Sequence, residues 1–426
     1  MRVAFHTLGC KVNQCETETL AESFERRRHE IVSADGFADV YIINTCTVTG
    51  LADRKSRQCI RRCKKLNPEA IVAVTGCYAQ INPGEISCIS GVDIVCGNND
   101  KTNLPQQIEE HLAGSVCISR DVPTKTSDTG SRTRAFIKIQ DGCDRFCSYC
   151  IVPYARCVLS SKPLFNVLRE AEVMIDAGRK EIVLAGINTA LYKTTEGYDI
   201  EDIIRELSGL KGDFRIRLSS LEPTVIDVDF VKKLLKYEKL CRHMHLSLQS
   251  GSDNTLKLMN RRYNISDYME IVTALRGFDA DYGISTDMIV GFPGEVEDDF
   301  NKSLEIVETV GFCKVHVFKF SGRKGTDAFG MDGQIDGKEK SRRSALMIVG
   351  AEQSARRFFG DNLGKRRRVL IEEYIEKSGT FTGFTENYIR VYIDRSSAYS
   401  VDLNAFVDVK LKGLYKDGVK GEIESG

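Results

Sequence analysis

The stretch Asp141-Gly142-Cys143-Asp144-Arg145-Phe146-Cys147-Ser148-Tyr149-Cys150 decides the fold class of this chain. Its three cysteines are separated by three and then by two residues, and they follow a strand-like run at 135–140. Three thiolates in one tight loop can hold three corners of a [4Fe–4S] cube, whose usual ligands are four cysteine sulfurs. The fourth iron then stays open, as a metal position does when it must bind a substrate.

This CxxxCxxC spacing resembles that of the radical S-adenosylmethionine (SAM) superfamily, in which the open iron chelates the amine and carboxylate of SAM. The aromatic Tyr149 just before the last cysteine and the βα pattern that follows argue against a chance match. We therefore predict that Cys143, Cys147 and Cys150 hold a SAM-binding cluster.

The length and the composition of the chain limit the number of domains and the class of protein that it can be. A chain of 426 residues is too long for one ordinary core and predicts two or three domains. Its 42% hydrophobic and 28% charged residues are typical of a soluble globular protein, and no apolar run reaches the length of a membrane helix. The N-terminus lacks the pattern of a signal peptide, so we expect a cytoplasmic protein with no membrane partner.

The cysteine count and the net charge narrow the choice further. The chain has 15 cysteines, and in a large cytosolic protein such a number favours metal binding or catalysis over disulfides. The net charge is zero, so contact with nucleic acid would have to come from local basic patches.

The N-terminal region, 1–116, alternates short apolar strands with helices. This alternation predicts a parallel, doubly wound sheet. The expected strands are 2–7, 40–44, 71–75 and 92–96, and the expected helices are 15–28, 53–66 and 83–90. Asp53 is the predicted N-cap of the second helix. A polar segment, 117–133, is predicted to be a linker.

The central region, 134–359, repeats βα units and predicts a partial (βα)6 barrel, since a closed barrel has eight. Its expected strands are 135–140, 181–187, 214–219, 243–248, 283–290 and 314–320, with helices such as 163–177, 228–237, 265–277 and 296–310. The C-terminal region, 360–426, has the short strands of a small all-β barrel. These are 369–374, 380–385, 389–393 and 406–414. The fold class is therefore α/β with a small β-barrel at the C-terminus.

A second set of three cysteines is spread over the N-terminal region, with dozens of residues between its members. Cys10, Cys46 and Cys77 each follow an expected strand of the N-terminal sheet within a few residues. The carboxyl ends of parallel strands line one crevice, so the three thiols are expected to converge there. One such cysteine alone would be read as a small buried hydrophobic residue, but three equivalent positions favour a second, auxiliary cluster.

Other cysteines are predicted not to be ligands of these clusters. Cys59 and Cys63 lie four residues apart on a basic helix and could share a face, but no third ligand is evident near them in the sequence. Cys157 lies close to the CxxxCxxC loop, and a fourth cysteine ligand would close the site for SAM.

The predicted barrel carries polar or glycine-containing turns at the carboxyl ends of its strands, where the chemistry of βα barrels takes place. Glycine lets the backbone approach an adenosyl group, and polar side chains can bind its edges. The candidate SAM-binding residues are Gly186, Asn188, Glu222, Gln249 and Gly291. Ordinary turn chemistry is the alternative for each of them.

Two basic segments are candidates for RNA contact. Arg61 and Arg62 lie on the helix 53–66, and Arg366 and Arg367 lie in a basic run beside the small barrel. Such runs can neutralise phosphates or can simply be solvated faces. The aromatic residues of the small barrel could stack on bases or fill its core.

At this point the chain resembles the methylthiotransferase family of radical SAM enzymes along essentially its whole length, and its end resembles a TRAM domain, a small RNA-binding barrel. The matching stretches around the predicted clusters are LGCKVNQ (8–14), NTCTVT (44–49), TGCYAQ (75–80) and IVPYAR (151–156). Those in the barrel are RLSSLEP (217–223), LSLQSGS (246–252), MNRRY (259–263) and IVGFPGE (289–295).

Within the family, the context GCKVNQ at 9–14 is similar to the branch that acts on N6-threonylcarbamoyladenosine at position 37 of tRNA. The resemblance implies methylthiolation of C2 of that nucleoside, with two [4Fe–4S] clusters and SAM as cofactors. It assigns the SAM cluster to Cys143, Cys147 and Cys150 and the auxiliary cluster to Cys10, Cys46 and Cys77. The implied partners are a tRNA anticodon stem-loop, a reduced electron donor such as flavodoxin or ferredoxin, and a sulfur donor.

Two segments depart from the family pattern. The family has glycine after the arginine of YAR and arginines where this chain has Ser160 and Lys162, and it has small residues where this chain has the segment 189–193. Both departures bear on the substrate more than on the clusters. The alternatives are a methylthiotransferase acting on isopentenyladenosine in tRNA or on a ribosomal protein, and a catalytically silent iron–sulfur RNA-binding paralogue.

Overall fold

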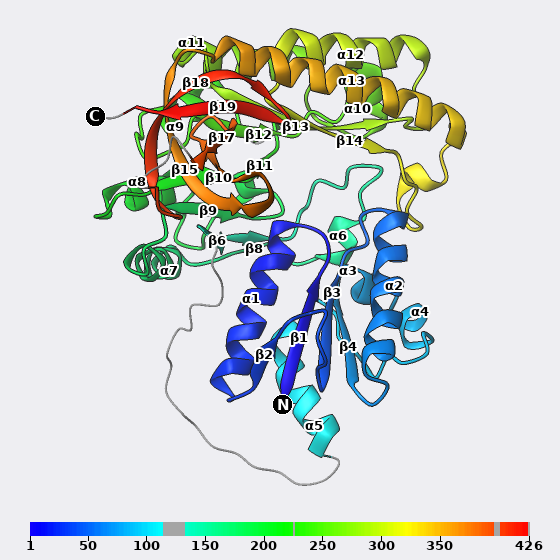
Figure 1. Cartoon of the computed structure of the whole chain (residues 1–426). Helices are drawn as coiled ribbons and strands as arrows, with labels where there is room; N and C mark the ends of the chain where they lie inside the picture. Colours follow the sequence, from blue (N-terminus) through cyan, green and yellow to red (C-terminus); the bar gives the residue numbers. More distant parts are fainter. Residues whose placement is uncertain (114–132, 225, 396–400, 425–426) are drawn as a thin grey trace. The chain divides into compact units, whose positions relative to one another are not determined.

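The computed structural model describes residues 1–113, 133–224, 226–395 and 401–424 of the chain (Figure 1). The chain forms two compact units, and neither is continuous in sequence. The first comprises Met1–Gly130, Asp141–Leu159 and Ser321–Phe329, and the second comprises Ser131–Gln140, Ser160–Phe320 and Gly330–Gly426. The CxxxCxxC loop thus belongs to the same unit as the N-terminal sheet. The predicted linker lies outside the described residues, except for Thr133.

The first unit is built on a five-stranded parallel sheet with strand order β2-β1-β3-β4-β5. The strands are β1 (Arg2–Thr7), β2 (Glu30–Val32), β3 (Val40–Thr45), β4 (Ile71–Gly76) and β5 (Ile94–Val95). Every residue of β3 and β4 is buried, as expected of central parallel strands covered on both faces.

Helices cover both faces of this sheet, so the predicted doubly wound arrangement is confirmed. Along β3, Val40 and Ile42 pack against helices α1 (Lys11–Arg26) and α5 (Leu104–Ala113). Tyr41 and Ile43 point to the opposite face and pack against three other helices. These are α2 (Gly50–Leu66), α3 (Cys77–Ile81) and α4 (Pro83–Ser87).

The N-cap of α2 is Thr49 rather than the predicted Asp53, so the helix begins one turn earlier than expected. The Thr49 side chain accepts a hydrogen bond from the backbone N–H of Ala52 at 3.2 Å. The carboxylate of Asp53 is instead occupied by Thr47 and Arg323, at 2.7 and 2.5 Å. A partner from the distant segment Ser321–Phe329 therefore overrode the local capping signal.

The second unit contains the predicted open βα barrel. Its parallel strands form two sheets, with orders β10-β9-β6 and β11-β12-β13-β14. The strands are β6 (Arg134–Lys138), β9 (Glu181–Ala185), β10 (Arg215–Leu218), β11 (Ser220–Leu221), β12 (His243–Leu246), β13 (Gly283–Val290) and β14 (Lys314–Lys319). Only Ser219 separates β10 from β11, so the chain passes from one sheet to the other at the end of the predicted strand 214–219.

Helices follow the strands and bury the apolar core of this barrel. They are α7 (Leu164–Asp176), α8 (Ile200–Gly209), α9 (Val228–Leu235), α11 (Ile265–Phe278) and α12 (Glu297–Val310). The long helix α13 (Gly337–Asp361) packs against α12 and β14 and leads into the C-terminal barrel.

The C-terminal residues form a closed five-stranded barrel of order β15-β16-β17-β19-β18, drawn in orange and red in Figure 1. Its strands are β15 (Arg366–Ile375), β16 (Thr380–Thr385), β17 (Arg390–Asp394), β18 (Phe406–Tyr415) and β19 (Gly418–Ile423). The sequence prediction missed β19. The basic residues Arg366, Arg367 and Arg368 lie within β15 rather than in a loop before it.

A buried carboxylate organises the amino end of the βα barrel against the small barrel. Glu181, the first residue of β9, is fully buried and pairs with Arg134, Arg215 and Arg217 at 3.3, 2.5 and 2.8 Å. The same arginines reach the small barrel: Arg215 donates to the carbonyl of Phe384 at 3.0 Å.

None of the helices in the described part of the chain combines the length and apolar character needed to span a membrane.

Candidate functional site

The structure places Cys10, Cys46 and Cys77 at the carboxyl ends of three neighbouring strands. Cys10 caps the start of α1 after β1, Cys46 directly follows β3, and Cys77 is the first residue of α3 after β4. Since β1, β3 and β4 are adjacent and parallel, the three residues share one edge of the sheet.

Two glycines allow the loops that carry these cysteines to approach each other. A Cβ on Gly9, whose φ is +102°, would lie 2.7 Å from the Cβ of Cys46. A Cβ on Gly76, whose φ is +97°, would lie 2.4 Å from the carbonyl oxygen of Thr45. Both positions therefore require glycine, both for the backbone conformation and for the close packing.

The thiols are near enough to influence one another's ionisation. Burial raises the pKa of Cys46 to about 11, and the neighbouring Cys77 and Cys10 contribute to the rise. Burial also raises the pKa of Cys10, with Cys77 adding to the rise, while the positive charge of Arg156 opposes it. Thiols such as Cys10 and Cys46, whose pKa values are raised, are donors that a cationic metal centre would stabilise as thiolates. The residues present thus fit an iron–sulfur cluster held by three cysteines.

Asn13 ties the loops of this cysteine set together. Its side-chain amide donates to the carbonyls of Leu8 and Thr45 at 2.7 and 3.0 Å, and its backbone carbonyl accepts from the side chain of Asn44 at 2.9 Å. The loops before Cys10 and Cys46 are thereby held at a fixed spacing. Asn13 belongs to the LGCKVNQ motif, but it lies before the predicted helix 15–28, and no role of its own was predicted for it.

The CxxxCxxC loop follows β7 (Gln140–Asp141) and precedes α6 (Val152–Ala155). Its three cysteines are each half-buried. Gly142 starts the loop with φ of +77°, and a Cβ there would lie 2.3 Å from the carbonyl oxygen of Val158. The backbone N–H of Cys150 donates to the carbonyl of Cys147 at 2.9 Å, which folds the loop back on itself. A tight loop that carries three half-buried thiols fits the predicted cluster site.

Arg156 connects this loop to the auxiliary cysteine set. Its side chain is almost completely buried, and it donates to both carboxylate oxygens of Glu16 and of Asp141, at 2.7–3.1 Å. It also donates to the side-chain oxygen of Asn13 at 2.8 Å. Asp141 begins the CxxxCxxC segment, whereas Asn13 and Glu16 lie on α1 just after Cys10. One guanidinium therefore bridges the two cysteine-bearing regions within the first unit.

A second buried cation, Lys101, balances the charge of this network. Its ammonium pairs with Glu16 and donates to the side-chain oxygen of Asn44 at 3.3 Å. Burial lowers the pKa of Lys101. Burial acts in the same direction on Arg156, but the bond to Glu16 and the nearby acidic groups outweigh it, so the pKa of Arg156 is raised and the guanidinium stays charged. Two cations thus face the two carboxylates of Glu16 and Asp141.

In the second unit, the predicted SAM residues Asn188 and Glu222 are in direct contact. The Asn188 amide donates to one carboxylate oxygen of Glu222 at 2.8 Å, and Arg261 donates to the other at 2.7 Å. Gly186 lies beside them: a Cβ there would be 3.1 Å from the side-chain oxygen of Gln140, which also accepts from the backbone of Asn188 at 3.0 Å. These residues lie at the carboxyl ends of β9 and β11.

Two buried polar atoms near the same strand ends have no hydrogen-bond partner among the described residues. They are the side-chain oxygens of Asn188 and Ser219. A buried polar atom without a partner costs about 1–3 kcal/mol, so such atoms commonly mark a place where a ligand donates. The residues at this strand end therefore fit a polar ligand such as SAM.

The other two predicted SAM residues have different surroundings. Gln249 is a non-glycine residue in the left-handed region, with φ of +70°, and its backbone pairs with β13 through Asp287 and Ile289. Gly291 has its backbone N–H bonded to the Glu295 carboxylate at 2.5 Å, and a Cβ there would lie 2.4 Å from a side-chain carbon of Lys340. These contacts belong to the turn, and a role of Gly291 in binding SAM stays a prediction.

The two departures from the family pattern contact each other. The hydroxyl of Tyr192 donates to the carbonyl of Lys162 at 2.7 Å, and the backbone N–H of Lys193 donates to the hydroxyl of Ser161 at 3.0 Å. The ammonium of Lys162 is paired with Glu170 on α7. Ser161 and Lys162 of the first departure therefore contact Tyr192 and Lys193 of the second within the second unit.

The predicted RNA-binding arginines differ in their availability. Arg61 and Arg62 are exposed on α2, and Arg62 pairs with the equally exposed Asp35 at 2.9 Å. Arg366 is exposed and pairs with Glu424. Arg367 has only 13% of its side chain exposed and is neutralised by Asp281 and Glu386, at 2.6 and 3.2 Å.

The aromatic residues of the small barrel mostly pack. Tyr392 is buried, and Tyr388 stacks on His243 of β12 with ring centroids 4.5 Å apart. Phe384 stacks on Tyr388 at 5.1 Å and carries Arg134 over its face. Packing against neighbouring side chains of the second unit thus accounts for these three rings.

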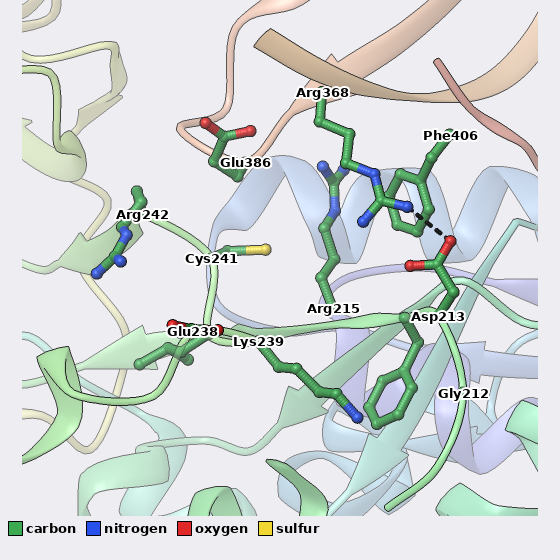
Figure 2. A pocket seen from close by; sticks show the side chains of 12 residues that line it. Gly212, Asp213, Arg215, Glu238, Lys239, Cys241, Arg242, Arg368, Glu386 and Phe406 are labelled. Atoms are coloured by element: carbon green, nitrogen blue, oxygen red, sulfur yellow. Dashed lines mark hydrogen bonds and ion pairs between the residues drawn. The ribbon is translucent and has the colours of Figure 1, made fainter. Parts of the chain in front are cut away.

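A cavity of about 440 Å³ lies between the amino ends of β10 and β12 and the small barrel (Figure 2). Arg368 and Asp213 form an ion pair at 2.6 Å across it, and the ring of Phe406 lies against the Arg368 guanidinium. Four basic side chains line this cavity together with three acidic ones. Its charge is nearly balanced, and it is at the end of the strands opposite to the one where βα barrels bind their substrates.

Comparisons with known proteins agree with this architecture. A family model described as "Radical SAM superfamily" matches residues 137–307, and one described as "Uncharacterized protein family UPF0004" matches residues 2–97. Among solved structures, a radical SAM methyltransferase, TsrM from Kitasatospora setae, has a TM-score of 0.56 at 14% identity and covers 75% of this chain and 74% of its own. At that identity the likeness shows the fold alone.

Curated relatives align along nearly the whole chain. "Threonylcarbamoyladenosine tRNA methylthiotransferase MtaB" from Bacillus subtilis (strain 168) is 38% identical, covering 91% of this chain and 89% of its own. The protein of the same name from Thermotoga maritima is also 38% identical and covers 98% and 96%. A "tRNA-2-methylthio-N(6)-dimethylallyladenosine synthase" from Jannaschia sp. is 33% identical over 91% and 87%. With this identity over this length, the chain belongs to the methylthiotransferase family of radical SAM enzymes, in the branch of the MtaB proteins.

Proposed function

We propose that this chain transfers a methylthio group to C2 of N6-threonylcarbamoyladenosine at position 37 of tRNA, using SAM and two [4Fe–4S] clusters. The observation that carries the proposal is that two sets of three cysteines lie in one compact unit and are bridged by the buried Arg156. One cluster is sufficient for radical chemistry with SAM, so the second set calls for a further role such as sulfur supply.

The residues divide between the two clusters as follows. Cys143, Cys147 and Cys150 would hold the SAM cluster, and Cys10, Cys46 and Cys77 would hold the auxiliary cluster. Bound there, the two clusters and SAM supply the radical and the sulfur that an inert aromatic C–H bond requires. The chain's own part is to position these groups and to keep the thiolates ionised.

Arg156 contributes to both tasks. Its bonds to Asp141 and to Asn13 fix the starting points of the two cysteine-bearing segments. Its charge also opposes the rise that burial causes in the pKa of Cys10. In the second unit, the Asn188–Glu222–Arg261 chain presents an oriented carboxylate and an unpaired amide oxygen, which suit the polar groups of SAM.

The nucleoside assignment is supported by the relatives and by one motif. The two 38% identical relatives carry threonylcarbamoyladenosine in their names, whereas the dimethylallyladenosine synthase is less similar, at 33%. The GCKVNQ context at 9–14 points the same way. The alternatives are isopentenyladenosine tRNA, a ribosomal protein and a catalytically silent role, and the experiment below separates the first and the last of them from the proposal.

Contact with the tRNA anticodon stem-loop is proposed to use Arg61, Arg62 and Arg366, which are exposed. Arg367 is left out, because its charge is already neutralised by two carboxylates. Each phosphate contact contributes about 0.7–0.9 to the slope of log affinity against log salt. A reduced protein electron donor such as flavodoxin or ferredoxin and a sulfur donor complete the proposed set of partners.

Reconstituted protein tests the proposal directly. The anaerobic enzyme is incubated with SAM, a reductant, a sulfur source and tRNA that carries either threonylcarbamoyladenosine or isopentenyladenosine. We expect 5′-deoxyadenosine together with a methylthio product on the tRNA that carries threonylcarbamoyladenosine. Deoxyadenosine without a methylthio product on that tRNA would contradict the substrate assignment. A product on isopentenyladenosine alone would move the substrate to the alternative, and no deoxyadenosine above background would support the silent paralogue.

A further inference from the structure

Three side chains outside both cysteine sets come together between the N-terminal sheet and α2. They are His6, Cys59 and Cys63, and one ligand atom from each lies within 4.8 Å of the others. Nothing in the proposed chemistry uses them. The sequence alone shows the cysteine pair but gives no third ligand, since His6 is more than fifty positions away in the chain.

The fold explains why the three residues meet. Side chains alternate along β1, so His6 points to the same face as Ala4, which packs in the core beneath α2. On α2, Cys59 and Cys63 are one turn apart and face the sheet, and Cys63 is fully buried in that core. The cluster is therefore anchored on two regular elements rather than on loops.

The histidine of this cluster has an unused nitrogen. The Nε2 atom of His6 is buried, and no hydrogen-bond partner for it exists among the residues that the structure describes. The ring is held by Tyr41, with which it stacks at a centroid distance of 6.4 Å. A buried imidazole nitrogen without a partner, beside two thiols, is an incomplete polar site.

The electrostatics favour a thiolate at this position. The neighbouring Cys63 and, to a smaller extent, His6 together lower the pKa of Cys59 to about 5 against the effect of burial. The interaction with Cys59 and burial raise the pKa of Cys63, so the pair favours one thiolate beside one thiol. The interaction with Cys59, in which the thiolate accepts from the imidazole, in turn raises the pKa of His6 against the effect of burial. A thiolate and an imidazole in contact are the ligand types that borderline and soft metal ions prefer.

We propose that His6, Cys59 and Cys63 form a separate mononuclear metal site that binds Zn²⁺ through one nitrogen and two sulfurs. Zinc binds thiolates at about 2.3 Å and imidazole at about 2.0–2.1 Å, so tetrahedral geometry places its ligand atoms about 3.3–3.8 Å apart. Atoms already within 4.8 Å of one another need only small side-chain adjustments to reach that spacing. Water would occupy the fourth position, since the cluster has three protein ligands.

Such an ion would join the two elements that frame the auxiliary cysteines. β1 leads within three residues to Cys10, and α2 begins four residues after Cys46. A metal bond between His6 and the two cysteines would hold these elements together independently of either cluster. The site is thus proposed to stiffen the auxiliary region, and it stands whether or not the methylthiolation proposal is correct.

The test uses the full-length protein with its iron–sulfur clusters loaded, so that the six cluster cysteines are not available to zinc. After exposure to Zn²⁺ and dialysis against a weak chelator, bound metal is measured by mass spectrometry and its coordination by zinc K-edge absorption. We expect stoichiometric zinc with two sulfur ligands and at least one nitrogen. Co²⁺ in place of Zn²⁺ should give the visible bands of a tetrahedral thiolate site.

Matched variants make the result specific. Cys59→Ser and His6→Phe are expected to lose the zinc while keeping the iron content of the wild type, whereas Cys88→Ser, at an exposed cysteine beyond α4, should keep it. Zinc bound by three or four sulfurs would place it in a cluster site and overturn the proposal. So would a wild-type protein with no zinc, or a Cys59→Ser protein with as much as the wild type.

Discussion

Arg156 and Glu16, which are 140 positions apart in the chain, form a two-pronged ion pair in the interior of the first unit. The two guanidinium nitrogens donate to the two carboxylate oxygens at 2.7 and 3.1 Å, and the Arg156 side chain is only 1% exposed. This parallel arrangement is the strongest geometry available to an arginine and a carboxylate. It joins the helix that follows Cys10 to the segment that follows the CxxxCxxC loop.

Removing this arginine should damage both cysteine regions. Arg156→Ala leaves the carboxylate of Asp141 without this cation and leaves the largely buried Glu16 paired with Lys101, and breaking a buried pair costs about 3–5 kcal/mol of folding free energy. We expect a lower midpoint of urea unfolding and a lower iron content after reconstitution. Arg156→Lys should recover only part of the loss, because an ammonium cannot bond in the same two-pronged manner.

An arginine at the surface provides the control for this variant. Arg205 pairs with Asp202 and Glu206 but is about half exposed. Arg205→Ala should leave the unfolding midpoint and the iron content unchanged, since exposed pairs contribute little. An Arg156→Ala protein as stable and as iron-rich as Arg205→Ala would show that the buried network has no supporting role.

The two cysteine sets should be separable by substitution. Cys147→Ala is expected to lose both SAM cleavage and methylthio transfer, whereas Cys10→Ala should lose the transfer and keep some SAM cleavage. The measurements are 5′-deoxyadenosine formation, methylthio nucleoside formation and iron per chain. Cys157→Ala, at an exposed cysteine next to Arg156, serves as the control and should keep all three. Full transfer by Cys10→Ala would refute the auxiliary assignment.

The amide of Asn188 is expected to contribute to SAM binding. Its side-chain oxygen is buried and has no partner among the described residues, while its nitrogen orients Glu222. Losing a buried hydrogen bond of about 1.5 kcal/mol corresponds to a tenfold weaker Kd, so Asn188→Ala should bind SAM about tenfold less tightly. Equilibrium dialysis measures the change. Asn166→Ala, at an exposed asparagine on α7, should bind SAM as the wild type does, and an equal affinity in both variants would argue against the role.

The fully buried Glu181 should make the second unit sensitive to acid. Burial alone would raise the pKa of Glu181, but Arg217, Arg215 and Arg134 hold it well below its usual range. As the pH falls, the unfolded chain therefore takes up a proton at this residue before the folded protein does. The stabilisation is complete above the pKa of an unfolded glutamate, about 4.3, and is lost as the pH falls through the depressed folded value.

Urea unfolding between about pH 6 and about pH 3 measures this effect. The wild type should lose stability steeply below about pH 4.3, and Glu181→Gln should start lower and show a flatter dependence on pH in that range. A similar Glu→Gln change at the exposed Glu308 is the control, because its partner Arg357 is also exposed. Parallel curves for the wild type and Glu181→Gln would contradict the buried arginine network as the source of acid sensitivity.

Much of the fold follows from local patterns in the sequence. The apolar runs gave β1, β13 and β16 with the bounds that the structure has, and the alternation of strands and helices gave the doubly wound sheet and the open barrel. The short edge strand β2 and the last strand β19 were missed, since a three-residue strand and a glycine-rich, charged one leave a weak pattern. The N-cap of α2 was wrong because a tertiary partner, Arg323, engages Asp53.

The candidate site was predictable where its residues form a recognisable pattern in the local sequence. Each cysteine of the two sets follows a strand or sits in a tight loop, so the spacing and the strand ends locate them. The supporting residues Glu16, Lys101 and Arg156 are charged and would ordinarily be placed at the surface by their type. Lys101 and Arg156 are buried and Glu16 has only 10% of its side chain exposed, because the three pair across long stretches of sequence. His6 meets Cys59 across a similar stretch. Such pairings are set by the tertiary fold and leave no periodic signal.

The central claim is tested most directly by mass spectrometry of tRNA nucleosides. A strain lacking the endogenous threonylcarbamoyladenosine methylthiotransferase is complemented with this chain, with Cys147→Ala, or with the empty vector. The account predicts that the methylthio form of threonylcarbamoyladenosine returns with the wild-type chain and is absent with the variant. If that nucleoside does not return although the protein carries its iron, the proposed substrate is contradicted, and isopentenyladenosine and ribosomal protein would be examined in its place.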